Sequence, residues 1–116
     1  MIQPQNASAS ASVPGLSPVD LARITMQPKF KLGRCVATPG AVSALARNRQ
    51  NHSYLLMMHE QALWIHMDDA GVARNVQAIE AGGAVHGVFN LRDGQVLWVI
   101  TDADRSATTL LLPEEY

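Results

Sequence analysis

The C-terminal stretch QVLWVITDADRSATTLLLPEEY at residues 95–116 limits the possible folds most strongly, because it joins two strand-like runs through a polar turn. Val96 to Thr101 and Thr108 to Leu112 are rich in β-branched and large apolar residues, which favour strands. The aspartates, arginine and serine between these runs supply the chemistry of a turn. The stretch therefore predicts a β-hairpin.

A third strand is expected directly before this hairpin. Apolar residues between positions 85 and 91 lead into an Asp-Gly pair at 93–94, which is a strong short-range signal for a hairpin turn. Three C-terminal strands should therefore form an antiparallel meander. The run from Phe30 to Ala37 is also strand-like, and we expect it to join the meander in a small antiparallel sheet.

Two or three helices are expected between the first strand and the meander. Thr38 is a suitable N-cap and Pro39 a suitable first residue for one helix. A second helix should run from Ser53 to about His66, where apolar residues cover much of the circumference. A third helix has Asp68 and Asp69 as its N-cap candidates and should end at the glycine pair 82–83. These patterns predict an α+β fold whose helices cover one face of the sheet.

The length of 116 residues and the hydrophobic content of 47% allow one modest core, and therefore one domain. Residues 1–26 begin with a low-complexity run of Ala, Ser, Pro and Gln. We expect this segment to be a disordered or partner-docking arm. Residues 27–116 should form the single α+β domain.

Charge and cysteine content narrow the partners and the compartment. Nine basic and ten acidic residues give a net charge of -1 and no basic stripe, so no direct contact with nucleic acid is expected. Cys35 is the sole cysteine, which excludes an intrachain disulfide and favours a reducing, cytoplasmic setting. We expect its thiol to be buried. No apolar run reaches about 18 residues, so no membrane partner is expected either.

The histidines do not form a convincing metal site. His52, His59 and His66 are spaced seven apart, which would separate them by about 10 Å along a helix. Zinc ligands on a helix usually lie three or four residues apart. We therefore predict no metal, no cofactor and no catalytic residue.

A protein-binding surface is the first functional hypothesis. Its expected residues lie on and after the apolar helix: Tyr54, Met57, Met58, Trp64 and Met67. Methionine and aromatic side chains are common at protein interfaces, although the same residues could simply fill the core. Because two tryptophans and a nearly all-apolar helix exceed what one small core readily covers, we expect a homodimer or a partner surface.

A polar pocket is the alternative hypothesis. His59, Asp102, Asp104 and Arg105 could gather near the turn of the last hairpin and bind a small ligand or act as an enzyme. This hypothesis requires the four side chains to converge within hydrogen-bond reach. Turn and cap duties are the competing explanation for the aspartates.

Three segments resemble a group of small uncharacterised proteins carried on bacterial plasmids and integrated mobile elements. They are LGRCVATPGAVSAL at 32–45, the spacing of His59, Trp64 and Asn75, and LWVITDADRSATTLLLPEEY at 97–116. The resemblance covers roughly residues 30–116.

The chain departs from that group in its polar motif. Members typically carry a Gly-Asp-Trp-Gly stretch after the histidine, where this chain has Ala62-Leu63-Trp64-Ile65. A polar motif that has become apolar implies a scaffold converted to binding. The mobile-element setting implies inhibition of host defence, most concretely an anti-CRISPR protein that binds a CRISPR effector or nuclease without enzymatic activity.

Overall fold

The computed structural model describes residues 27–116, so the predicted arm at residues 1–26 lies outside the described part. The elements in chain order are β1 (Arg34–Ala37), α2 (Pro39–Asn48), α3 (His52–Glu60), α4 (Asp69–Ala81), β2 (Val85–Asn90), β3 (Val96–Thr101), β4 (Ala107–Leu111) and the short 3-10 helix η2 (Pro113–Glu115). None of the helices over residues 27–116 is long and apolar enough to cross a membrane.

The four strands form one sheet in the order β1-β4-β3-β2. The C-terminal meander is confirmed, because β2 pairs with β3 and β3 with β4 in antiparallel fashion. The first strand differs from the prediction: β1 runs parallel to β4, so the sheet is mixed. Side chains alternate between faces in both kinds of pairing, and the sequence pattern therefore could not reveal the direction of β1.

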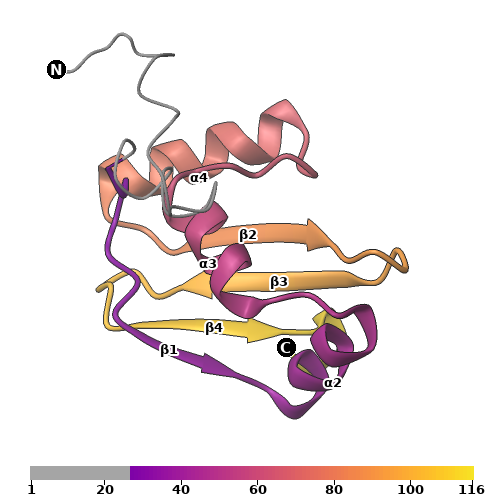
Figure 1. Cartoon of the computed structure of the whole chain (residues 1–116). Coiled ribbons are helices and arrows are strands. Elements are labelled where there is room, and N and C mark those ends of the chain that lie inside the picture. The colour runs from indigo at the N-terminus through magenta and orange to yellow at the C-terminus, as the bar shows by residue number, and fades with distance from the viewer. Residues whose placement is uncertain (1–26) are drawn as a thin grey trace, which may run out of the picture.

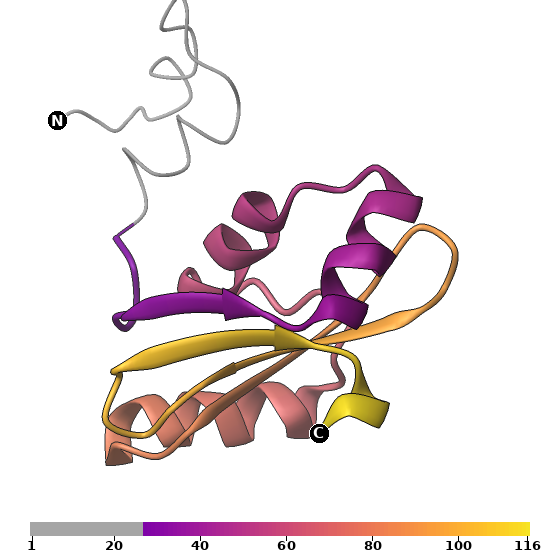
Figure 2. The ribbon, with the colours of Figure 1, turned by 90° about the horizontal axis from the view of Figure 1, so that it is seen from below.

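The α+β class is confirmed, but helices cover both faces of the sheet. Figures 1 and 2 show α2 and α3 on one face, while α4 lies beside β2 on the other. The main core fills the space between α2, α3 and the sheet. Its largest members from the strands are Val85, Phe89, Leu97, Val99 and Leu110, and those from the helices and their connections include Leu45, Leu55, Leu56, Met57, Met58 and Trp64.

The helix starts follow the predicted capping chemistry. The Thr38 side chain accepts a hydrogen bond from Ala41 N at 3.2 Å, and Pro39 is the first residue of α2. The Asp68 carboxylate accepts from Gly71 N at 2.8 Å and begins α4. These local signals lie within four residues of the helix they begin, which is why they could be read from the sequence.

The end of α3 was predicted wrongly. The helix stops at Glu60, because Ala62 adopts a left-handed conformation with a φ of 61°. Leu63 N then donates to Met58 O at 2.8 Å, and Ala62 N donates to His59 O at 3.0 Å. This pair of bonds is a helix-ending motif that usually uses glycine. The turn brings Trp64 back onto His59 instead of continuing the helix to His66.

Candidate functional site

The predicted polar residue His59 lies at the centre of a buried hydrogen-bond chain. Its side chain has no solvent exposure. Trp64 Nε1 lies 3.0 Å from His59 Nδ1, and His59 Nε2 lies 3.0 Å from Thr101 Oγ1. The chain continues from Thr101 Oγ1 to Thr108 Oγ1 over 2.7 Å, and from Thr108 Oγ1 to the carbonyl of Leu32 over 2.7 Å.

The hydrogens of this chain have one consistent arrangement. Thr108 must donate its hydroxyl hydrogen to the Leu32 carbonyl, which can only accept, so Thr108 accepts from Thr101. Thr101 in turn accepts from His59 Nε2, which leaves Nδ1 free to accept from the indole of Trp64. The imidazole is therefore neutral, with both nitrogens satisfied.

The electrostatics of the site agree with a neutral ring. Burial, which is the larger cause, and repulsion from His86 together lower the pKa of His59 from 6.5 to about 3. The Phe30 ring also packs against the imidazole in a T-shaped arrangement, with ring centroids 5.1 Å apart. Such a histidine holds β3, β4 and α3 together and does not exchange protons near neutral pH.

Gly87 makes room for this arrangement and was not singled out from the sequence. A Cβ atom at that position would lie 2.5 Å from His59 Nδ1 and 3.0 Å from Trp64 Nε1. The sequence did contain a signal for this role, because a glycine inside a strand of alternating apolar residues often marks the close approach of another group.

The predicted polar pocket is not formed. Asp102 and Asp104 are exposed. Hydrogen bonds from the Ser106 side chain and from Ser106 N, the latter at 3.0 Å, lower the pKa of the Asp104 carboxyl. Arg105 donates to the carbonyl oxygens of Gly83 at 2.6 Å and Ala78 at 3.3 Å. These bonds tie the β3–β4 turn to the end of α4. His59 is separate and enclosed, so the four side chains do not converge.

Most of the predicted contact surface is also in the core. Met57, Met58 and Trp64 are buried and Met67 is partly buried, because α3 and the turn after it are covered on most sides. Only Tyr54 is well exposed, at 48%. The apolar side chains that suggested a dimer are therefore accommodated within one chain.

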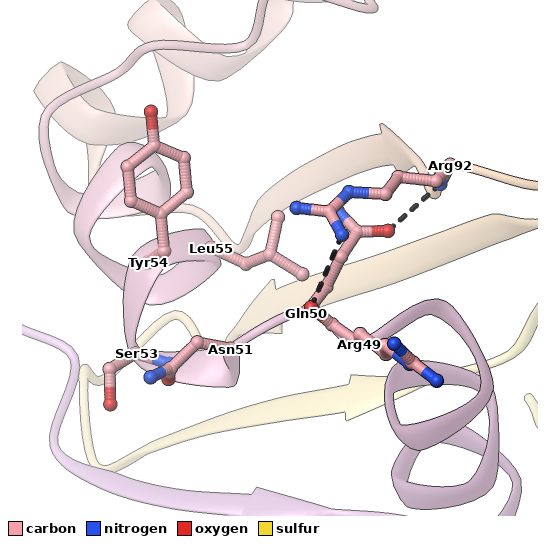
Figure 3. Close-up of a pocket in the computed structure, with 7 residues that line it drawn as sticks. All are labelled: Arg49, Gln50, Asn51, Ser53, Tyr54, Leu55 and Arg92. Carbon is pink, nitrogen blue, oxygen red and sulfur yellow. Dashed lines mark hydrogen bonds between the residues drawn. The ribbon is translucent and has the colours of Figure 1, made fainter.

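Tyr54 lines an open cleft of about 580 Å³ at the connection between α2 and α3. Figure 3 shows the guanidinium of Arg92 reaching into this cleft beside Gln50. Arg92 N donates to Gln50 Oε1 at 2.8 Å, and its guanidinium donates to the carbonyl oxygens of Asn48 and Arg49 at 3.3 and 3.4 Å. Arg92 therefore caps the C-terminus of α2 and fastens it to the β2–β3 hairpin.

The two edges of the sheet differ in how they are finished. At the β2 edge, the buried Asn75 of α4 donates to His86 O at 2.9 Å and accepts from His86 N at 3.0 Å. One side chain thus occupies both outward backbone groups of His86, in place of a neighbouring strand. Figure 1 shows α4 lying along this edge.

The β1 edge has no such cover among residues 27–116, and all four residues of β1 are exposed. Arg34 N and Thr38 N donate to carbonyls on the β4 side, to Ser106 O and Leu110 O. Because backbone groups alternate along a strand, the N–H and C=O groups of Cys35 and Ala37 point to the open side.

An apolar groove of about 430 Å³ runs beside this open edge, between β1, α2 and α3. Its walls include Val42, Leu45, Leu56 and Leu110, with the Cys35 side chain at the strand. The prediction of a buried thiol is wrong, because Cys35 is exposed on the edge strand. Partial burial and the charge of Glu60 raise the pKa of this thiol, so it is not an activated nucleophile.

Among residues 27–116, no group of three or more His, Cys, Asp or Glu side chains is placed to hold a metal ion. Comparison of the chain with protein-family models, with curated proteins and with solved structures gave no match. The open edge of β1 and the groove beside it are therefore the candidate binding site.

Proposed function

We propose that this protein is a non-enzymatic binding module that receives an extended segment of a partner protein as a fifth strand beside β1. The observation that carries the proposal is the contrast between an open strand edge and the apolar groove alongside it. Strand addition is a common mode of peptide recognition, in which backbone hydrogen bonds give affinity and pockets for alternate side chains give specificity.

The geometry of β1 suits this mode. Cys35 and Ala37 offer outward N–H and C=O groups, and their register with Thr108 and Leu110 puts their side chains on the core face of the sheet. Alternate side chains of an added strand would therefore enter the groove and contact Val42. Val42 is 56% exposed, so its burial would contribute hydrophobic free energy to binding.

The arrangement of polar residues supports binding over catalysis. His59 is neutral and fully bonded, and Arg105 is bonded to backbone carbonyls. Neither is oriented toward a concave site together with a second reactive group, which an enzyme would need.

The partner to test first follows from the resemblance to mobile-element proteins. We propose that the module inhibits host defence by binding a CRISPR effector or nuclease. Occlusion through direct contact fits a chain of net charge -1, which lacks the strong negative charge of a DNA mimic. A second copy of the chain is the other candidate for the edge.

The experiment compares tagged wild-type protein with Ala37→Pro and Ala37→Ser in capture of purified CRISPR effector complexes. Proline removes the outward N–H of residue 37, whereas serine keeps it and stays small. Stoichiometric capture by the wild type and Ala37→Ser, with loss in Ala37→Pro, would support the proposal. Equal capture by all three variants would place the interface elsewhere.

Light scattering of the same three proteins tests the second copy. A dimer in the wild type that becomes a monomer in Ala37→Pro would make the edge a self-association surface. A monomer in all three leaves the edge available to a different partner.

A further inference from the structure

We propose that the segment received at β1 is acidic, with apolar side chains at alternate positions and carboxylates between them. This inference rests on the proposed function and names the chemistry of the partner. It is carried by the charges around the open edge and by the apolar lining of the groove.

Cations are concentrated where the chain enters the open edge. Lys29, Lys31 and Arg34 lie within six residues of one another and are all exposed. None of the residues that line the adjacent groove is acidic. Glu60 influences Cys35 electrostatically, but its side chain is largely buried, so it does not give the surface an acidic character. Two exposed carboxylates also lie near the ends of β1, but both accept hydrogen bonds within the protein: Glu115 from Thr38 Oγ1 and Gly40 N, and Asp104 from Ser106 N. The basic stretch before β1 therefore favours a partner that brings negative charge to that end of the edge.

The two faces of the added strand would meet different surroundings. Side chains directed to the core face would contact Val42, Leu45 and Leu56, which requires them to be apolar. The side chains at the positions in between would lie on the opposite face of the sheet. Arg34 and Val36 are on that face, in register with Ala107 and Thr109. Carboxylates at those positions can approach the Arg34 guanidinium.

The same charges disfavour a second copy that pairs in parallel. Parallel pairing of two β1 edges would bring the Lys29, Lys31 and Arg34 of both copies side by side, whereas antiparallel pairing would separate the two sets. Like charges across paired strands are destabilising. Basic residues at an exposed edge are also a recognised protection against self-association through that edge.

The test uses two fluorescent peptides, acetyl-EVEVEVE-amide and acetyl-KVKVKVK-amide, with the folded full-length protein. Binding is measured by anisotropy, and occupation of the edge is measured by the rate at which Cys35 reacts with a thiol reagent. The acidic peptide should bind roughly tenfold more tightly at low salt, and the preference should shrink as salt is added. Its binding should slow the reaction of Cys35.

Arg34→Glu is the informative variant, and Arg74→Glu on α4 is its matched control. Both change the net charge equally, but only Arg34 lies on the open edge. The first should lose or reverse the preference for the acidic peptide, and the second should keep it. Circular dichroism at the start of each titration confirms that the variants are folded.

The outcomes separate this inference from the proposed function. If both peptides bind equally and both protect Cys35, strand addition stands and the acidic partner is ruled out. If neither peptide binds or protects Cys35, both the acidic partner and strand addition at β1 are rejected.

Discussion

The two edges of this small sheet show opposite solutions to one physical problem. An edge strand exposes unpaired backbone groups, which can pair with any available strand. At β2, Asn75 bonds both outward groups of His86, and α4 lies alongside. At β1, no strand among residues 27–116 pairs with the outward groups of Cys35 and Ala37, which lie beside an apolar groove. The comparison shows that two side chains, Asn75 and His66, close the β2 edge together with α4, because His66 Nδ1 accepts from Asn90 N at 3.0 Å. Among residues 27–116, no strand pairs with the outer side of β1.

His59 stabilises the core on which both edges pack. Acid should therefore destabilise both edges together. The pKa of His59 is about 3 in the folded protein and near 6.5 when unfolded, so the unfolded state binds the proton more readily. The contribution of His59 to stability is fully present above pH 6.5. Below that pH, the free energy of unfolding falls by about 1.4 kcal/mol per pH unit until about pH 3. The total loss is about 5 kcal/mol, and burial of His86 acts in the same direction.

Urea unfolding at pH 7 and pH 5 measures this effect. The wild type should lose about 2 kcal/mol between these two values. His59→Phe is the control, because it removes the titrating group and should flatten most of the dependence. An equal loss in wild type and variant would assign the pH dependence to other residues.

Asn75→Ala should make the β2 edge resemble the β1 edge, because it exposes the outward backbone groups of His86. The change leaves the N–H and C=O of His86 without their partner and should cost about 3 kcal/mol. Hydrogen exchange at the His86 amide should become much faster, and the protein should aggregate more readily. Asn75→Asp keeps the acceptor for His86 N and loses the donor, so it should lie between wild type and Asn75→Ala. Unchanged exchange in Asn75→Ala would mean that α4 closes the edge without the amide.

Ala37→Pro and Val36→Pro should distinguish the outward backbone groups of β1 from those that face β4. Proline at 37 removes an outward N–H and should cost about 1 kcal/mol or less in stability, although it blocks strand addition. Proline at 36 removes the N–H that faces β4 and should cost about 3 kcal/mol. Thermal unfolding of the two variants measures the difference. Equal destabilisation would contradict the assignment of inward and outward backbone groups.

Local chemistry explains how much of the fold was predictable. The caps at Thr38 and Asp68, the glycine at 82 and the Asp-Gly turn at 93–94 act within a few residues of the structure they specify. The end of α3 was missed because Ala62 takes a left-handed conformation normally given to glycine, and tertiary packing of Trp64 favours that turn.

The site residues were harder to predict, because their roles depend on partners distant in sequence. Trp64 and Thr101 give His59 its bonds, and Thr101 is 42 residues away. The open edge arises because β1 joins the sheet beside β4, more than 70 residues later. Neither the bonds of His59 nor the pairing of β1 with β4 can be read from a local sequence pattern. The sequence therefore predicted an exposed helix, whereas the structure has an exposed strand.

The most direct test of the open edge is the reactivity of Cys35 in the presence of a bound partner. The thiol of the free protein should react with a water-soluble reagent, because Cys35 is exposed on β1. A captured effector, or the acidic peptide, should slow this reaction strongly in the wild type and leave it unchanged in Ala37→Pro. A partner that binds stoichiometrically while Cys35 reacts at its original rate would contradict the assignment of β1 as the docking edge.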